Sequence, residues 1–145
     1  MQNVVRPRSA PRAIALAAAA IGLAACSSPA DPMPSGATCP PGNTLTYDNF
    51  AAGFMASYCT RCHASTLDGP DRHGAPLFHD FDSKLGILNV GHHVDEYAAA
   101  GPRAVNELMP NDGAQPTLAE RQQLGQWLAC ELAALEGVDA GVDGP

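Results

Sequence analysis

Two cysteines and a histidine stand together in the stretch Cys59-Thr60-Arg61-Cys62-His63. In this C-x-x-C-H spacing each thiol can form a thioether to one haem vinyl group, while the adjacent imidazole reaches the iron. The pattern predicts covalent haem attachment through Cys59 and Cys62, with His63 as an axial ligand. A zinc site would need further Cys or His ligands at short spacing. A thioredoxin-like dithiol would expect a βαβ context, which the sequence does not show.

Met109 is the candidate for the other axial position. It is followed by Pro110 in the polar stretch 106–113, and the proline restricts the backbone around this soft thioether. The other three methionines are the first residue, Met33 in a Pro-rich stretch, and Met55 four residues before Cys59. We expect Met109 to be the sixth ligand; the alternatives are that it only packs or that a histidine takes the position.

Other residues could support or replace these ligands. An iron-bound imidazole usually donates its second ring N–H to an acceptor, which orients the ring. In the Gly- and Pro-rich loop expected over 64–81, the Pro76 carbonyl is the candidate acceptor for His63; the alternative is a simple turn proline. Distal acid–base groups or ligands could come from four further histidines, although each alone is more often a surface residue: His73, His79, His92 and His93.

Helices must position these residues. A cap at 46–48 predicts a helix over about 49–58 that leads directly into the C-x-x-C-H stretch, with one aromatic face formed by Phe50, Phe54 and Tyr58.

Shorter elements are expected in the middle of the chain. Asp82 or Ser83 can cap a helix through about Val90, with Leu85 and Leu88 buried. A further short helix is expected over 94–100 and one more turn over 102–108.

The last helix has the clearest start. Thr117 and Glu120 form a capping box. An apolar stripe follows at Leu124, Trp127, Leu128, Leu132 and Leu135. We expect Trp127 to be a core residue, rather than a redox relay, that packs this helix on the Phe50/Phe54 face.

The N-terminus reads as a targeting segment. Three arginines without an acid in 1–12 precede a short apolar run over 13–23, as in a signal peptide. Its ending, Leu-Ala-Ala-Cys, resembles a bacterial lipobox, which implies cleavage after residue 25 and a lipid on Cys26. The alternative is ordinary cleavage near Ala25 with Cys26 free. We therefore expect export and a membrane anchor facing the periplasm, with Ser27 favouring the outer membrane.

The amino-acid composition of residues 26–145 changes along the chain and indicates three segments. We expect a flexible Pro-rich tether over 26–43, one domain over 44–135 and a disordered acidic tail over 136–145. Without 1–25 the chain keeps 5 basic and 15 acidic residues, a net charge of −10 with His neutral. Nucleic acid, which needs a basic footprint, is excluded as a partner. The acidity suits a partner with a basic docking face, or serves solubility alone.

Of the five cysteines, Cys39 and Cys130 remain after the haem and lipid assignments. An even pair in an oxidising compartment predicts a disulfide between the start of the domain and its last helix, with two free thiols as the alternative.

Over residues 44–135 the chain resembles a class I c-type cytochrome domain. The resemblance rests on Cys59, Cys62 and His63, on the Met109-Pro110 loop, and on the paired first and last helices. It implies an all-α fold of three to five helices around one covalently bound haem c, with His63 and Met109 as the axial ligands.

Three classes of function follow. With both axial positions filled by protein, the iron has no open position for a substrate, so one-electron transfer is the leading hypothesis. The protein would then be a non-enzymatic carrier that meets redox partner proteins. A thioether ligand would favour ferrous iron. The alternative is a sensor or a small-ligand-binding, peroxidase-like module in which Met109 is labile. A structural lipoprotein would lose little when Met109 is replaced.

Overall fold

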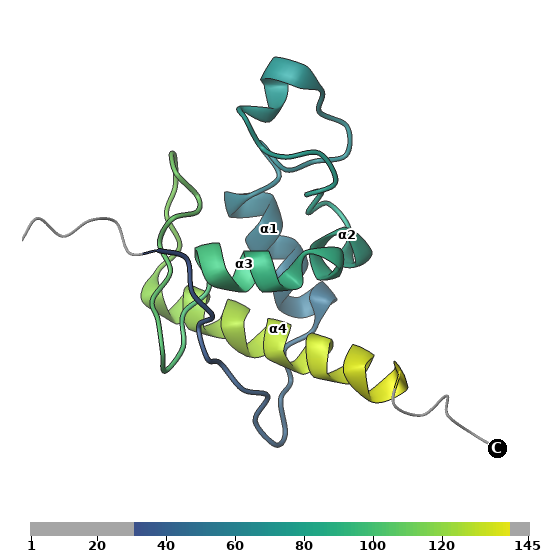
Figure 1. The fold of residues 1–145 in the computed structure, drawn as a ribbon, viewed down its shortest axis with the longest axis vertical. Helices are drawn as coiled ribbons and strands as arrows, with labels where there is room; N and C mark the ends of the chain where they lie inside the picture. Colours follow the sequence, from purple (N-terminus) through teal and green to yellow (C-terminus); the bar gives the residue numbers. More distant parts are fainter. Residues whose placement is uncertain (1–30, 140–145) are drawn as a thin grey trace, which may run out of the picture. The chain divides into compact units, whose positions relative to one another are not determined.

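In a computed structural model of the chain, residues 31–139 can be described, and they form an all-α arrangement (Figure 1). A π-helical turn at Tyr47–Ala51 runs into α1, Ala52–Tyr58. A 3₁₀ turn follows at Gly69–Arg72. The remaining helices come next, in this order: Lys84–Asn89 (α2), Gly91–Ala98 (α3) and Leu118–Asp139 (α4). The expected all-α class is confirmed for this part of the chain. Its only β pairing is an isolated bridge in the connection between α3 and α4.

Several expectations concern residues outside this range. The signal peptide over 1–25, Cys26 and residues 140–145 all lie outside the described residues. Residues 136–139, which the sequence assigned to the tail, belong instead to α4, which continues to Asp139. Among residues 31–139, no helix has both the length and the apolar character needed to cross a bilayer.

Side-chain caps start three of the helical segments. Thr46 Oγ1 accepts from the Asn49 N–H at 3.1 Å, and Asn49 Oδ1 accepts from the Thr46 N–H at 2.7 Å. Ser83 caps α2. At α4, Thr117 N–H donates to Glu120 Oε2 at 2.8 Å, and Glu120 N–H donates back to Thr117 Oγ1 at 3.3 Å. Each cap satisfies backbone donors that a helix start leaves unpaired, so the predicted starts at Ser83 and Thr117 are confirmed.

The core lies where α1, α3 and α4 meet. Trp127 is fully buried on α4, as expected of a core residue. Its neighbours in the core include Phe54 and Met55 of α1. Tyr58 Oη also donates to Glu120 Oε1 at 2.9 Å, which ties the end of α1 to the start of α4. The first and last helices therefore share one core, as the sequence predicted.

Two local expectations in the middle of the chain are wrong. Leu85 is 71% exposed, because the short α2 turns Ile87 inward instead. The stretch 102–108 forms no helical turn. Its backbone pairs elsewhere: Arg103 N–H donates to the carbonyl of Ser35 at 2.8 Å, and Val105 makes the isolated bridge to Ala100.

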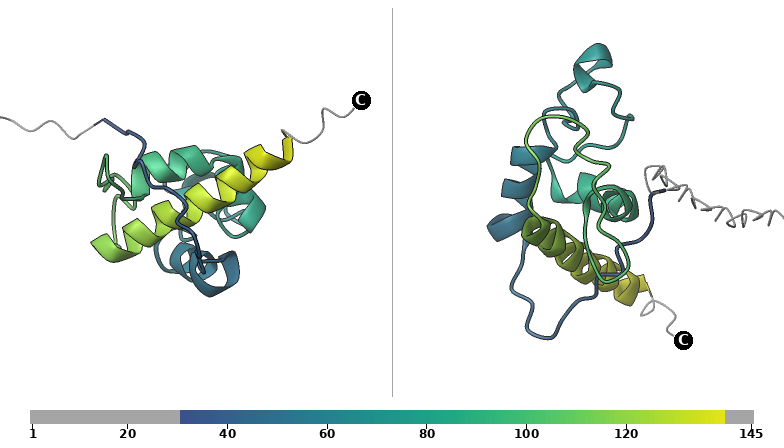
Figure 2. Two further views of the ribbon diagram at one scale, coloured as in Figure 1. Left: turned by 90° about the horizontal axis from the view of Figure 1, so that it is seen from below. Right: turned by 90° about the vertical axis from the view of Figure 1, so that its left-hand side faces the viewer.

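The N-terminal part of the described chain is packed rather than free (Figure 2). Ser35 is fully buried, and its backbone N–H donates to Asp95 Oδ2 of α3 at 2.8 Å. Gly101 lies so close that a Cβ there would be 2.7 Å from the Ser35 carbonyl oxygen. The predicted disulfide is confirmed, with Cys39 and Cys130 joined and their Cα atoms 4.6 Å apart. The expectation of a flexible tether up to residue 43 is therefore wrong for 35–43, because this extended chain finds partners for its polar groups in α3 and α4.

Candidate functional site

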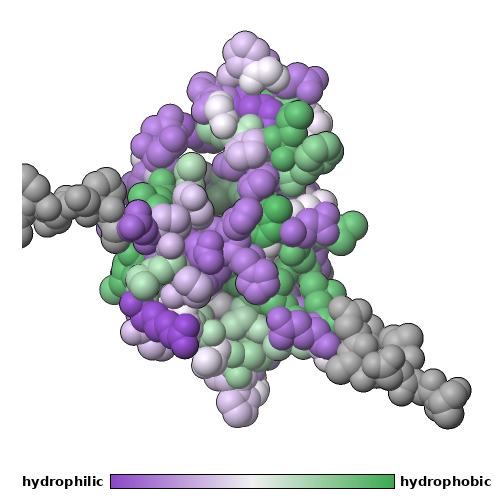
Figure 3. Space-filling view, in the orientation of Figure 1, coloured by the Kyte–Doolittle hydropathy of each residue, from purple (hydrophilic) through white to green (hydrophobic). Residues whose placement is uncertain are grey.

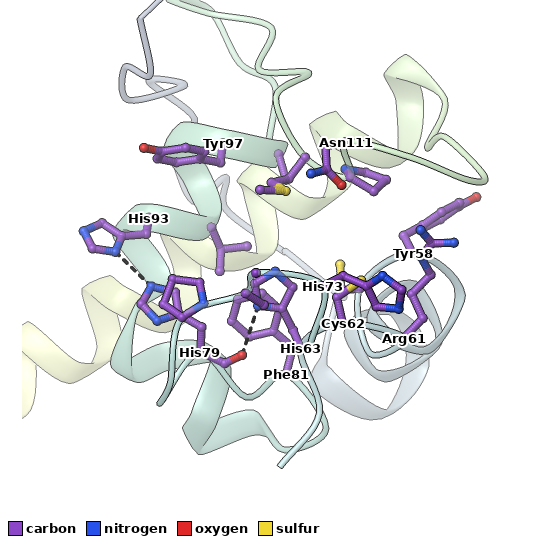
Figure 4. A pocket seen from close by; sticks show the side chains of 18 of the residues that line it. Tyr58, Arg61, Cys62, His63, His73, His79, Phe81, His93, Tyr97 and Asn111 are labelled. Atoms are coloured by element: carbon purple, nitrogen blue, oxygen red, sulfur yellow. Dashed lines mark hydrogen bonds between the residues drawn. The ribbon is translucent and has the colours of Figure 1, made fainter. Parts of the chain in front are cut away.

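A cavity of about 460 Å³ opens between the loop that follows α1 and the α3–α4 region. Figure 3 shows the surface hollowed below that loop, and Figure 4 shows the side chains inside. All four residues that the sequence selected as haem attachment points or iron ligands line this one cavity: Cys59, Cys62, His63 and Met109. Residues 46 positions apart in the chain are thus brought together around one space.

The two cysteines sit on a tight turn at the end of α1. The Cys59 N–H donates to Met55 O at 2.9 Å, and both Cys62 and His63 donate backbone N–H groups to Cys59 O, at 3.1 and 3.0 Å. Both thiols are free and half-buried. This turn presents two thiols and an imidazole to the same wall of the cavity.

The electrostatics of Cys59 argue against a redox dithiol. Burial raises its pKa to about 12, and the nearby positive charge of Arg121 only partly opposes this. A reactive dithiol needs a lowered pKa, whereas the Cys59 thiol stays protonated at neutral pH. Within residues 31–139, no group of three His, Cys, Asp or Glu side chains is placed to hold a metal ion such as zinc.

His63 is held in one orientation (Figure 4). Its Nδ1 donates to the carbonyl oxygen of His79 at 3.0 Å, and its ring stacks on Phe81 with 4.5 Å between centroids and an angle of 13°. Burial is the largest influence and lowers the pKa of His63, although the hydrogen bond to His79 opposes it. The result is a neutral imidazole whose Nε2 lone pair is free for a metal.

The predicted role of Pro76 is wrong in detail. Its carbonyl accepts from Arg72 Nη2 at 2.8 Å and makes no hydrogen bond to His63. The loop continues three residues further, and the carbonyl of His79 takes the place expected of Pro76. A backbone carbonyl from this loop does orient His63, as the sequence suggested, but it belongs to another residue. Pro76 itself lines the cavity.

Met109 is fixed through its backbone on both sides. Its N–H donates to the carbonyl of Tyr97 at 2.9 Å, and its carbonyl accepts from Arg121 Nη1 at 2.8 Å. The side chain is partly buried against the core and lines the cavity. Both bonds hold the thioether-bearing residue at the cavity wall without using the sulfur.

The sequence analysis missed Arg121, a charged residue on the apolar side of α4 that is only 2% exposed. Besides Met109, its Nη1 donates to the carbonyls of Ala98 and Asn106, each at 2.8 Å. Burial lowers its pKa. No carboxylate among the described residues forms a salt bridge with it. An arginine within an apolar helical stripe was the available signal, since such a residue is rarely buried without partners.

An exposed ion pair joins the two sides of the cavity. Arg61, from the C-x-x-C-H turn, pairs with Asp112 of the Met109 loop. Gly113 lets the chain pass close by, since a Cβ at that position would be 2.7 Å from Arg61 Nη1, and its φ of +73° favours glycine. The segments that carry His63 and Met109 therefore touch each other directly.

Three of the four remaining histidines lie around the same cavity. His73, His79 and His93 line it, whereas His92 does not. His79 Nε2 and His93 Nδ1 are 3.3 Å apart, which joins the loop to α3 (Figure 4).

The donors around the cavity fit a covalently attached haem. Two uncommitted thiols, an imidazole with a free Nε2 and a thioether make up the set that such a group requires. The volume lies within the roughly 300–1,000 Å³ usual for ligand and cofactor sites. Comparisons of this chain with protein families, with curated proteins and with solved structures found no match.

Proposed function

We propose that this protein is a mono-haem electron carrier of the c-type cytochrome class. Cys59 and Cys62 would hold one haem c through thioethers, and His63 and Met109 would be its axial ligands. The observation that carries the proposal is that all four side chains line one cavity, with the imidazole already oriented by its bond to the His79 carbonyl. When bound, the haem would supply one-electron exchange between Fe(III) and Fe(II).

The residues of the chain favour transfer over catalysis. The His79 carbonyl fixes the His63 ring, and the bonds of Met109 to the Tyr97 carbonyl and from Arg121 fix its backbone. Ligands held so rigidly suit a site that keeps its coordination through both oxidation states. The protein would act as a carrier and not as an enzyme.

The surface around the cavity suggests how a redox partner would dock. Leu77 and Phe78 are 65% and 82% exposed beside residues that line the cavity. The acidic side chains of Glu96 and Asp112 are also part of its wall. A partner with basic residues around an apolar patch would match this rim, and electrostatic attraction would speed its encounter. Nucleic acid would be repelled by the same charges.

The test is the visible spectrum of the purified holoprotein beside that of Met109→Ala. The wild type should show low-spin iron with a sulfur-to-iron charge-transfer band, and the variant should lose that band. Met33→Ala is the matched control, because Met33 is 48% exposed and does not line the cavity. High-spin iron in the wild type, or a band that survives in Met109→Ala, would overturn His/Met ligation.

A sensor or peroxidase-like module is the second candidate, favoured by the three histidines around the cavity. In that case Met109 would yield its position to a small ligand. Carbon monoxide distinguishes the two functions, because the reduced electron carrier should not bind it readily. Rapid binding by the wild type would favour the sensor.

A further inference from the structure

Arg72 is a second buried arginine, 4% exposed, and it organises the loop below which the cavity opens. Its guanidinium donates to one carboxylate, Asp80 Oδ1 at 2.9 Å, and otherwise to backbone carbonyls. The nearest of these belong to Pro76 (2.8 Å), Ala64 (3.0 Å), Ala75 (3.3 Å) and His79 (3.3 Å). The cation therefore faces a ring of carbonyl oxygens, one of which is the acceptor for His63.

The carbonyl of His79 accepts two hydrogen bonds. His63 Nδ1 donates to it at 3.0 Å and Arg72 Nη2 at 3.3 Å. A carbonyl oxygen has two lone pairs and can accept both. The two donors still compete, because a guanidinium withdraws electron density from the oxygen and so makes it a weaker acceptor for the imidazole.

We propose that Arg72 sets the reduction potential of the site by weakening the hydrogen bond that His63 makes to the His79 carbonyl. A strong acceptor gives an iron-bound imidazole more imidazolate character and increases its basicity, which favours the ferric state. Arg72 limits that effect and so favours the ferrous state. Its positive charge acts in the same direction, since a nearby cation opposes the additional charge of ferric iron. The inference rests on the proposed function, and Arg72 is a positioning residue that acts through His79.

Asp80 counterbalances Arg72. Its carboxylate is 28% exposed and forms the only salt bridge that Arg72 makes within the described part of the chain. Asp80→Asn removes this negative charge but keeps an oxygen acceptor, so the loop should stay in place. The uncompensated Arg72 should then withdraw more electron density from the His79 carbonyl. Arg72 and Asp80 variants should therefore shift the potential in opposite directions.

The experiment measures the midpoint potential of the holoprotein by spectroelectrochemical titration in Arg72→Met, Arg72→Lys and Asp80→Asn. At a fixed applied potential, Arg72→Met should lower the ratio of reduced to oxidised protein about tenfold. For one electron this corresponds to a midpoint potential lower by about 59 mV. Arg72→Lys keeps the charge and should shift the ratio less. Asp80→Asn should raise it severalfold. Asp82→Asn is the matched control, since Asp82 is an exposed acid bound to Ser65 and not to Arg72.

A second readout follows the hydrogen bond itself. The His63 Nδ1–H resonance should move downfield in Arg72→Met and stay near its wild-type position in Asp82→Asn, both in the reduced holoprotein and in the haem-free chain. Unchanged potential and resonance in Arg72→Met would overturn the proposal. So would a lowered potential in Asp80→Asn, because a merely loosened loop predicts the same sign for both variants.

Two other failures remain distinguishable. If Arg72→Met folds poorly, the sign of the shift in Asp80→Asn decides alone. If the wild type binds no haem, the proposed function fails before any potential is measured. The proposal about the potential then falls with it, although the resonance in the haem-free chain still shows whether Arg72 controls His63.

Discussion

Each of the two walls of the cavity carries one candidate iron ligand, and a buried arginine donates hydrogen bonds to backbone carbonyls of each wall. On the His63 wall, Arg72 bonds to a loop that surrounds it in sequence and reaches no partner more than eight residues away. On the Met109 wall, Arg121 lies on α4 and bonds to carbonyls 12 to 23 residues earlier in the chain. One wall is stabilised locally, and the other depends on how α4 docks.

The charges of the two walls differ as well. Arg72 has a carboxylate partner in Asp80, whereas Arg121 has backbone carbonyls and one amide oxygen, that of Gln115 at 3.1 Å. We therefore expect the His63 wall to keep its arrangement when the rest of the domain loosens. We expect the Met109 wall to lose its arrangement when α4 shifts, so that Met109 is the candidate ligand lost first.

Removing the disulfide should have the largest effect. Replacing Cys39 and Cys130 by Ala opens a link between residues 91 positions apart, which in the chain-entropy model costs about 4–5 kcal/mol of unfolding free energy. Because Cys130 lies on α4, the Met109 wall should loosen first. Urea titration of this variant should show the sulfur-to-iron band disappearing before the helical circular dichroism signal. A single coincident transition would show that the walls unfold together.

Arg121→Met tests the Met109 wall alone. Three buried carbonyls lose their donor, and we expect a loss of about 3 kcal/mol in unfolding free energy. The ferric holoprotein should also lose its sulfur-to-iron band while its haem stays attached. Denaturant unfolding and absorption spectra measure the two effects.

Arg103→Met is the control for that change, because Arg103 is an exposed cation in the connection between α3 and α4. It should leave both stability and spectrum near the wild type. An intact band in Arg121→Met would contradict the role of Arg121 in holding Met109.

The contact between the two walls should matter less. The side chains of Arg61 and Asp112 are 46% and 56% exposed, so water and salt screen their attraction. We expect Asp112→Asn to cost about 0.5 kcal/mol, equivalent to roughly a twofold change in equilibrium. Imidazole added to the oxidised protein should displace Met109 about twofold more readily in this variant at low salt. If that difference persists at 1 M salt, the ion pair is not its cause.

The smallest expected effect is on the pH dependence of the unfolding free energy, through Glu120. Hydrogen bonds from Thr117, first from its hydroxyl and then from its backbone N–H, and from Tyr58 lower the pKa of Glu120 below its ordinary value of 4.5. A depressed folded-state pKa contributes stability above the unfolded value and loses it as the pH falls through the folded value. Unfolding free energy should therefore decline slightly less steeply below pH 4.5 in Glu120→Gln than in the wild type. Equal slopes would mean that Glu120 does not link pH to stability.

The parts of the site encoded by short spacing were predictable from the sequence. The turn that carries Cys59, Cys62 and His63, and the caps at Ser83 and Thr117, depend on residues within a few positions of one another. The sequence also predicted the disulfide, because a count of cysteines left one even pair.

What escaped prediction depends on contacts across the fold. No local pattern shows which carbonyls a buried arginine meets, so Arg72 and Arg121 could not be assigned roles. The acceptor for His63 was placed three residues early, because the path of the loop, and so the carbonyl that reaches the ring, cannot be read from its sequence. The packed stretch 35–43 was misread because its composition is that of a linker, while its order comes from Asp95 and α4.

If Cys26 carries the lipid expected from the sequence, the docked N-terminal stretch would limit how far the domain stands from the membrane. Pro32 lines the cavity, and six residue steps separate it from Cys26. Even a fully extended chain spans at most about 3.6 Å per residue, or roughly 20 Å over those steps. A lipid on Cys26 would therefore keep the rim of the cavity close to the bilayer surface. Electron exchange would then be a two-dimensional search among neighbours in the same membrane, and a longer linker would lower the local concentration of such partners.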